Sequence, residues 1–438
     1  MAEIVGQRLL SWIADRPAAA IPLFALAAAE RVAWTLNGHL QSLDTELRNA
    51  AISWAQTGWV ADAFRPGSGP TAHVGALPPV ISGLVFRLFG VESPTTALVL
   101  TTLSALTVVA TALVLSRVFA KLGTPAPVRG AAVVLICLVP LHIELESRSL
   151  RVYENGYAAL ALALLLLAVV RLDRGRTIGM RDMLGLSAFA ASIVALSPTV
   201  GFCAVALLGL LALRRLAWSG RLGAAMMLAI VLVGTSLPWA LRNQAVLGET
   251  VWTRSNFGLE FALGMHPAAV DPVDPAATYL ARLAEIHPHG NDAPYRAMRA
   301  AGGELPYAHR LGDRTWDWVG THPVQAGTIW LRHIREFFFP PPWLWHHTAQ
   351  PDATTALRIV AANVIAALAL VGLFGALARR QWLFLYLIPP IILLPLPYLL
   401  TQPLVRYRYV IASLLIFLAA DALARLTGRG QGALKRAV

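Results

Sequence analysis

Long apolar runs alternate with shorter polar segments along most of the chain. A helix needs about 20 apolar residues to cross a bilayer. Runs that meet or approach this length predict ten spans, at 17–36, 94–116, 129–143, 152–171, 183–197, 199–213, 222–241, 354–377, 382–400 and 409–425. The two short runs joined at Pro198 predict a tilted pair or a re-entrant hairpin. The expected fold class is an all-α polytopic membrane protein.

The composition agrees with a membrane protein. Of 438 residues, 57% are hydrophobic and 14% are charged, against about 45–50% and about 25% in soluble domains. These values exclude a soluble enzyme, a disordered chain, a collagen and a DNA-binding module. The two cysteines, Cys137 and Cys203, lie within apolar runs, which excludes a disulfide framework and a cysteine metal site.

The net charge of +12 is distributed in short basic clusters between apolar runs. If both termini are cytoplasmic, these clusters fall on the cytoplasmic side, as the positive-inside rule requires. The other side then receives two long segments, 37–93 and 242–353. We expect three modules, which are an N-terminal transmembrane module with the first outer loop (1–241), an extracytoplasmic subdomain (242–353) and a C-terminal transmembrane module (354–438).

Both outer segments contain structural signals. In the first, apolar residues recur at helical spacing from Leu43 to Trp54, and residues 78–88 form a second amphipathic stretch. Two helices along the membrane surface are therefore predicted. In the second segment, many prolines and polar residues predict a small, loop-rich subdomain with a few short helices.

Two carboxylates, Asp44 and Glu46, closely follow the first predicted span. Either one would place a general base beside a lipid-borne substrate. Positions two apart on a helix point about 200° away from each other, so only one of them faces a given cavity. The alternative for Asp44 is structural, as a first-turn residue that pairs with Arg48 four positions later.

Two further polar clusters lie on the same predicted side. Glu144, Glu146 and Glu154 lie in or beside the turn between the third and fourth spans, either as functional acids or as part of a solvated turn. Arg406 and Arg408 precede the last span. Arginines in such a place either bind a phosphate group or extend toward lipid headgroups. A lipid that carries a phosphate satisfies both alternatives.

Metal and nucleotide motifs give no positive signal. His287 and His289 form an isolated His-x-His without further ligands at metal-binding spacing. We therefore expect no metal site and no required cofactor, although the paired acids are compatible with a divalent ion. Walker, dinucleotide-binding, Gly-x-Ser-x-Gly and His-Glu-x-x-His motifs are absent, which argues against nucleotide use.

Six fragments, in a fixed order, carry a resemblance to a known family. They are LDTELRNAAISWAQTG at 43–58, LPPVISGLVFRLFG at 77–90, SRSLRVYENGY at 147–157, PWALRNQAVLGETVWTRSNFGLEFALGMHP at 238–267, THPVQAG at 321–327 and RYRY at 406–409. Together they resemble the GT-C superfamily of polytopic glycosyltransferases. Within it, the similar branch holds protein O-mannosyltransferases and bacterial aminoarabinose or mannose transferases, as in glycosyltransferase family 39.

The resemblance implies a GT-C-like helix bundle that transfers a sugar, with inversion, from a polyprenyl phosphate to an extracytoplasmic lipid, glycan or protein. Asp44 matches the family's first-loop catalytic acid and would act as general base. The further implied acids are Glu46, Glu154 and Glu144. The implied ligands of the lipid phosphate are Arg406, Arg408, Arg242 and Arg254. The residues implied to position the sugar or acceptor are Asn256, Glu146 and His73.

Two other classes stay open on the residues. Arginines and histidines of the second outer segment keep open an O-antigen ligase or polymerase that uses a diphosphate-linked glycan; they are Arg310, Arg314, His322, Arg332, His333 and Arg335. A lipid or glycan transporter (flippase) is disfavoured because the chain shows no inverted repeat. In each case the expected partners include membrane lipids and no nucleic acid. The arginine-rich, lysine-poor composition indicates a bacterial plasma membrane.

Overall fold

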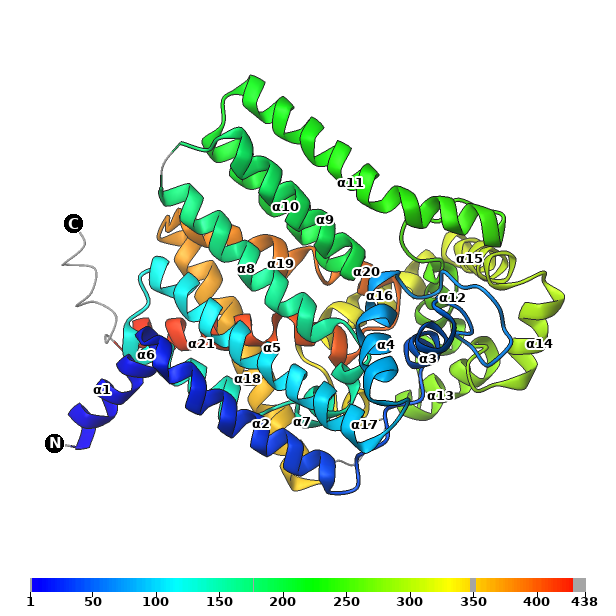
Figure 1. Ribbon diagram of the computed structural model, residues 1–438, viewed down its shortest axis with the longest axis horizontal. Coiled ribbons are helices and arrows are strands. Elements are labelled where there is room, and N and C mark those ends of the chain that lie inside the picture. The colour runs from blue at the N-terminus through cyan, green and yellow to red at the C-terminus, as the bar shows by residue number, and fades with distance from the viewer. Residues whose placement is uncertain (1, 176, 347–351, 428–438) are drawn as a thin grey trace.

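The computed structural model describes residues 2–175, 177–346 and 352–427. Residues 428–438 of the predicted C-terminal module lie outside these ranges. The described chain is helical without a β-strand, and an isolated bridge joins Ala61 to Pro70. Apolar helices form a bundle, and residues 37–93 and 248–346, which we call the cap, gather at one end of it (Figure 1). The predicted all-α polytopic fold is confirmed.

Eight segments of the described chain are long and apolar enough to cross a membrane, so this is a multi-pass membrane protein. After α1 (Ala2–Asp15) they are η1 and α2 (Pro17–Ala19 and Ala20–Leu36), α5 (Pro94–Lys121), α8 (Asn155–Arg174), α10 (Pro198–Arg215), α11 (Trp218–Leu247), α18 (Ala353–Ala378), the broken segment of η4, α19 and α20 (Trp382–Leu387, Ile388–Ile392 and Leu396–Leu400), and α21 (Val405–Leu426).

Two of the ten predicted spans, 129–143 and 183–197, are helical but are not among these eight segments. α9 (Met180–Leu196) has 17 residues and ends before Pro198. The third predicted span is divided into α6 (Ala126–Leu138) and a second part made of α7 (Ile143–Ser147) and η2 (Ser149–Arg151), with a bend of 63° between the two parts. Pro140 lies in the break, where it cannot continue the helical hydrogen bonds. With this bent pair counted as one span, the described residues contain nine.

Close contacts between helices hold the bundle together. α5 packs against α2, α6 and α8, and α18 packs along α21. Small residues permit this approach, as is usual between membrane helices. A Cβ atom on Gly372 of α18 would lie 2.7 Å from the Cβ of Ala422 of α21, and one on Gly156 of α8 would lie 2.8 Å from Oγ1 of Thr107 of α5. Larger residues at these glycines would force the helices apart.

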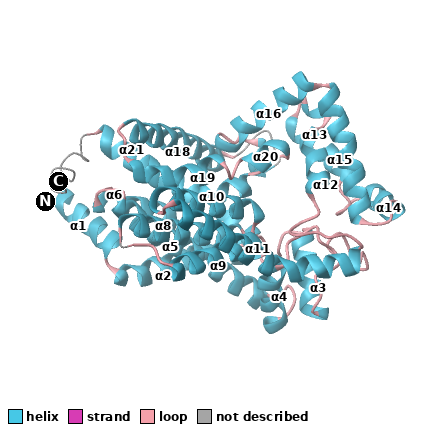
Figure 2. Ribbon diagram, turned by 90° about the horizontal axis from the view of Figure 1, so that it is seen from above, coloured by secondary structure: helices cyan, strands magenta, loops and turns pink. Residues whose placement is uncertain are grey.

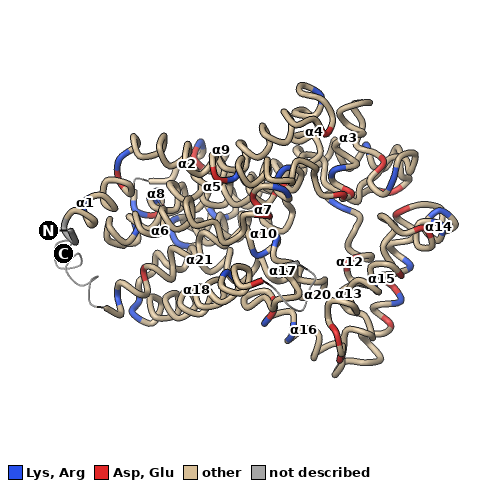
Figure 3. Tube along the Cα trace, turned by 90° about the horizontal axis from the view of Figure 1, so that it is seen from below, with Lys and Arg blue, Asp and Glu red and all other residues tan. Residues whose placement is uncertain are grey.

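Basic clusters gather at the end of the bundle that lies farthest from the cap, near both ends of the chain (Figure 3). Arg174 donates to the carbonyl of Lys121 in this region. Arg214 forms an ion pair of 3.1 Å with Asp173. The cap also carries basic residues, together with acidic ones (Figure 3).

The cap is built from both long polar segments (Figure 2). The two predicted surface helices are present as α3 (Glu46–Thr57) and α4 (Leu77–Phe89), which pack against each other. The second segment forms α12 (Phe257–Gly264), η3 (Pro267–Ala269), α13 (Pro275–Ile286), α14 (Asp292–Ala300), α15 (Glu304–Thr321), α16 (Pro323–Phe338) and α17 (Trp343–His346). It is more helical than predicted, because several of its prolines begin helices, where the missing N–H costs nothing.

Candidate active site

A cavity of about 320 Å³, which we call cavity A, lies where the cap meets the bundle. Its walls come from the start of α3, the loop before α4, the turn before α8, the start of α10, the region of α12, and the segment from α20 into α21. Its charged and histidine side chains are Glu46, His73, Glu154, Arg254, Glu260 and Arg406. Segments far apart in the sequence therefore bring both signs of charge to one place.

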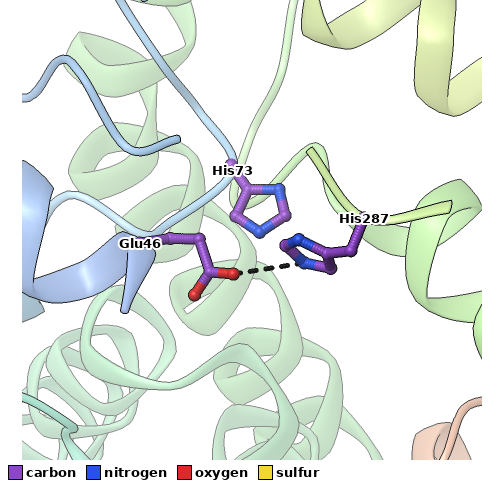
Figure 4. Close-up of side chains that lie close together, drawn as sticks. All are labelled: Glu46, His73 and His287. Atoms are coloured by element: carbon purple, nitrogen blue, oxygen red, sulfur yellow. Dashed lines mark ion pairs between the residues drawn. The ribbon is translucent and has the colours of Figure 1, made fainter. Parts of the chain in front are cut away.

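Local structure places Glu46 at this cavity. Thr45 caps α3, because its hydroxyl accepts a hydrogen bond of 3.2 Å from the Arg48 N–H. Glu46 is then the first residue of the helix, where the helix dipole favours a carboxylate. Its Oε1 lies 3.1 Å from Nε2 of His287, which directly follows α13 (Figure 4). This contact joins the two segments of the cap.

Glu46, His73 and His287 form a cluster whose nitrogen and oxygen ligand atoms all lie within 4.8 Å of one another (Figure 4). Burial alone would raise the pKa of Glu46, but nearby imidazoles, with His287 first, lower it to about 2. Burial lowers the pKa of His73 to about 3. At neutral pH the carboxylate is therefore ionised and His73 is neutral, and these are the forms that bind a metal ion.

The three side chains of this cluster fit a divalent cation. Two imidazole nitrogens and one carboxylate oxygen are a donor set used in catalytic zinc sites. Among the described residues, this cluster is the group of His, Cys, Asp and Glu side chains close enough to share an ion. Local spacing in the sequence gives no sign of it, because its members come from three separate segments.

Two partly buried arginines face the same cavity. Arg254 donates to Oε1 of Glu154 at 2.5 Å, and Arg406 donates to the hydroxyl of Tyr407 at 3.0 Å. The Arg406 guanidinium also lies 4.6 Å from the ring centroid of Tyr153. The Nε–H of each arginine is buried without a hydrogen-bond partner among the described residues. Since a buried donor without a partner is costly, both groups are ready to receive an anionic oxygen.

A second cavity, also of about 320 Å³, lies beyond Tyr153 and Arg406, which line both cavities. We call it cavity B. Its walls include Asp44, Glu144, His142, Trp345 and Arg358. The His142 ring stacks on the ring of Trp345 at a centroid distance of 4.9 Å. Cavity B thus combines a carboxylate-bearing wall with an aromatic one.

Asp44 differs sharply from Glu46 although one residue separates them. Its side chain is 74% exposed, and it lies 3.6 Å from Arg48 and 3.6 Å from His289. The pair with Arg48 is the structural alternative that the sequence suggests. Asp44 lines cavity B whereas Glu46 lines cavity A. Each carboxylate thus lines a different cavity, but Asp44 precedes α3, so the helical angle assumed from the sequence does not apply to this pair.

The predicted site residues fall into three groups. Cavity A brings together six of them, which are Glu46, His73, Glu154, Arg254, Asn256 and Arg406. Cavity B holds two others, Asp44 and Glu144, and shares Arg406. Neither cavity is lined by the remaining three, Glu146, Arg242 and Arg408.

These last three residues have structural partners. Glu146 accepts a hydrogen bond of 2.9 Å from Arg31 of α2. Arg408 donates to a main-chain carbonyl of α18 at 2.9 Å. Arg242 donates to two main-chain carbonyls of the first cap segment, at 2.6 and 2.8 Å. In the structure, each of these three side chains links its own helix to another part of the chain through hydrogen bonds.

The residues of cavity A and of the cluster that are not among the predicted site residues include Tyr153, Tyr407, Glu260 and His287. The tyrosines are direct neighbours of predicted residues, and Glu260 follows Asn256 by one helical turn, so sequence spacing offers a signal for all three. Burial raises the pKa of Glu260 above its ordinary value. The His-x-His pattern marks His287 in the sequence, but its partners Glu46 and His73 depend on how the second cap segment folds over the first.

No protein-family model and no curated protein matches the chain. Among solved structures, it is similar to the archaeal oligosaccharyltransferase AglB from Archaeoglobus fulgidus in complex with an inhibitory peptide and a dolichol-phosphate. The sequence identity is 13%, the match covers 98% of this chain and 52% of that chain, and the TM-score is 0.48. The apo form of the Archaeoglobus fulgidus oligosaccharyltransferase gives 14% identity, 96% and 52% coverage, and a TM-score of 0.49.

A bacterial structure is also similar. ArnT from Cupriavidus metallidurans bound to undecaprenyl phosphate gives 14% identity, with 93% of this chain and 78% of that chain covered and a TM-score of 0.35. The chain spans about half the length of the oligosaccharyltransferase that it matches. Because the TM-scores are below 0.5, we assign residue roles from the geometry of the two cavities alone.

Proposed function

We propose that the chain is a membrane glycosyltransferase that moves a sugar from a polyprenyl phosphate to an acceptor on the cap side of the membrane. One observation carries this proposal. Cavity A combines two buried arginine Nε–H groups that have no partners with the cluster of Glu46, His73 and His287. The arginines offer donors to a phosphate, and the cluster offers ligands to a divalent cation, where the bundle meets the cap.

The position of cavity A suits a lipid with a charged head. Pro198, Thr199 and Phe202 of the spanning helix α10 form part of its wall. The Phe202 side chain is 61% exposed on that helix, so this wall continues to a surface that faces lipid. A polyprenyl phosphate would place its phosphate at Arg254 and Arg406 and its hydrocarbon chain along α10. The charged and apolar parts of the ligand thus match two parts of the cavity.

The reaction proposed here takes place where the two cavities meet, beside Tyr153 and Arg406. An acceptor hydroxyl enters from cavity B, and Asp44 accepts its proton. The hydroxyl oxygen attacks the anomeric carbon of the sugar. The bond from that carbon to the phosphate oxygen breaks with its electron pair, and Arg254 and Arg406 stabilise the charge on the departing polyprenyl phosphate. Because the acceptor oxygen attacks the face of the anomeric carbon that is opposite the phosphate, the anomeric configuration is inverted.

Glu46 suits a different task from Asp44. A carboxylate with a pKa of about 2 is a weak base at neutral pH. We therefore assign Glu46, His73 and His287 to holding a divalent cation, in place of the metal-independent chemistry expected from the sequence. When bound, this ion supplies positive charge beside the phosphate. The hydrogen bond from Arg254 to Glu154 holds the guanidinium in place.

The proposal places the cap outside the cytoplasm of a bacterial plasma membrane, because the basic clusters lie at the opposite end of the bundle. No observation favours the ligase alternative. Its arginines and histidines in the second cap segment line neither cavity. Arg332 donates to main-chain carbonyls beside η3, and His333 contacts the carbonyl of Leu399 at 3.0 Å.

The test is donor consumption by purified protein in lipid vesicles, with a panel of radiolabelled polyprenyl-phosphate sugars and candidate acceptors. We expect release of polyprenyl phosphate together with labelled product. Arg254→Gln should reduce both at least about 100-fold, whereas Glu285→Gln, at an exposed cap carboxylate, should leave both unchanged. The proposal is wrong if no donor is consumed while a diphosphate-linked glycan is transferred or a labelled lipid merely crosses the bilayer.

A further inference from the structure

Glu304, the first residue of α15, joins the two segments that carry the residues of cavity A, although it does not line that cavity. Its Oε2 accepts a hydrogen bond of 2.6 Å from the Thr71 hydroxyl. Its Oε1 accepts one of 2.6 Å from the Ala72 N–H and one of 3.0 Å from the Ser255 hydroxyl. One carboxylate therefore binds the segment before His73 and the segment after Arg254.

Two further hydrogen bonds continue from this carboxylate toward the site. The Thr71 hydroxyl, which donates to Glu304, accepts the His73 N–H at 3.0 Å. The Ser255 N–H donates to the Ala72 carbonyl at 2.9 Å. The main chain at His73 is thus tied to Glu304 through Thr71, and it is tied to the neighbour of Arg254 through Ala72.

A third cavity, cavity C, of about 310 Å³ adjoins this junction, and residues 67–71 and 302–306 form part of its lining. Thr71 and Glu304 both line cavity C, so packing contacts are missing where they face it, and the hydrogen bonds between them help to hold the segment in place. An ionised carboxylate suits this task because it only accepts hydrogen bonds and its two oxygens can take three donors.

We propose that Glu304 is a positioning residue that sets the cation cluster and the phosphate site in register by holding His73 and Arg254 together. This inference rests on the function proposed above, since it needs both residues to act on one substrate. It assigns Glu304 no contact with that substrate. Its substitution should therefore loosen the site without removing any ligand from it.

The experiment compares wild type with Glu304→Gln, in which an amide replaces one acceptor oxygen. Co²⁺ alone is the probe, and its binding is followed by visible absorbance. Supporting residues of metal ligands typically contribute about 10- to 100-fold in affinity or activity, and we expect a loss of that size. Hydrogen exchange at amides 71–73 and 254–256 should become faster. In the donor assay, kcat should fall by a larger factor than the factor by which KM changes. Glu285→Gln should match wild type in every measurement.

Thr71→Val is the second variant, in case Glu304→Gln does not fold. It removes only the hydroxyl between Glu304 and His73, so it should speed exchange at residue 73 and weaken Co²⁺ binding while α15 remains intact. Unchanged exchange and Co²⁺ affinity in a folded variant would overturn the inference. A wild-type protein that consumes no donor and binds no Co²⁺ would instead contradict the proposed function, and the exchange measurement would still report whether Glu304 holds the junction.

Discussion

Cavities A and B have similar volumes and share Tyr153 and Arg406, yet their other walls differ in kind. In cavity A, Glu46 pairs with buried His287 and Arg254 with buried Glu154, and the Nε–H groups of Arg254 and Arg406 have no partner among the described residues. In cavity B, Asp44 is largely exposed and faces a wall that contains a stacked pair of aromatic rings. One cavity suits a fixed anionic group, and the other suits an acceptor that arrives from solvent.

The difference shows how a short stretch of chain can serve two environments. Thr45, the N-cap residue of α3, separates Asp44 from Glu46, the first residue of the helix. Glu46 lies among imidazoles that hold its pKa at about 2, while the largely exposed Asp44 lies beside Arg48. The same functional group, a carboxylate, therefore suits cation binding in one place and the proposed proton transfer in the other.

Substitution of Arg406 should have the largest effect, since this residue lines both cavities. Arg406→Gln should lower transfer at least about 100- to 1000-fold, the usual loss for a group that stabilises transition-state charge. Arg358→Gln, in cavity B alone, is the matched control and should leave polyprenyl phosphate binding unchanged. Both are measured by single-turnover transfer and by lipid binding. Equal loss of lipid binding in the two variants would contradict the division of roles.

The two carboxylates should separate chemistry from cation binding. Asp44→Asn should lower kcat about 100- to 10,000-fold, as expected for loss of a general base, and should keep Co²⁺ binding. Glu46→Gln should abolish Co²⁺ binding, because an amide is a poor cation ligand. Titration calorimetry with Co²⁺ and single-turnover assays measure the two effects. Loss of Co²⁺ binding in Asp44→Asn would show that the assignments are reversed.

The aromatic wall of cavity B should act on the acceptor alone. Trp345→Ala removes the partner that stacks on His142, and we expect KM for the acceptor to rise about tenfold, which is the scale of one aromatic contact. Without added acceptor, the rate of donor hydrolysis, in which water takes the place of the acceptor and polyprenyl phosphate is released, should stay the same. A matching loss in that hydrolysis would mean that Trp345 supports both cavities.

The smallest expected effect concerns Gln402, which lies in the segment just before Arg406. Gln402 donates to Glu336 of α16 at 3.4 Å, and burial raises the pKa of Glu336 to about 7. A carboxyl group whose pKa is higher in the folded state stabilises the fold below its unfolded pKa, and this contribution is lost as pH rises through about 7. Thermal unfolding in detergent should therefore shift down by a few degrees between pH 5 and pH 8.

Glu336→Gln should remove this part of the pH dependence, because the amide does not titrate. Glu285→Gln, at an exposed cap position, should retain it. The unfolding temperatures of wild type, Glu336→Gln and Glu285→Gln are compared between pH 5 and pH 8. A slope that survives in Glu336→Gln would assign the pH dependence to another group.

The fold follows from the sequence because a bilayer sets the length of an apolar helix, and runs such as 94–116 and 354–377 meet that length without help from distant residues. The site follows only in part. Asp44, Glu46 and Arg406 are found because they stand at the ends of predicted helices. His287 is noted in the sequence but set aside as a metal ligand, because only the folded chain brings its ring to Glu46.

Partners also explain where the predicted site and the structure diverge. Glu146 lies at the right level of the bundle, but Arg31 of α2 pairs with it. Arg408 is two residues from Arg406 and points to α18 instead of cavity A. The sequence shows the type and level of such a side chain, whereas its direction depends on which helix packs beside it. This is the information that a single sequence lacks.

The most direct test of the central claim is a cryo-electron microscopy structure of the protein in a lipid nanodisc with polyprenyl phosphate. We predict that the phosphate density lies in cavity A, within hydrogen-bond distance of Nε of Arg254 and Nε of Arg406, and that the hydrocarbon chain follows α10. A phosphate located in cavity B, or at the basic end of the bundle, would contradict the account.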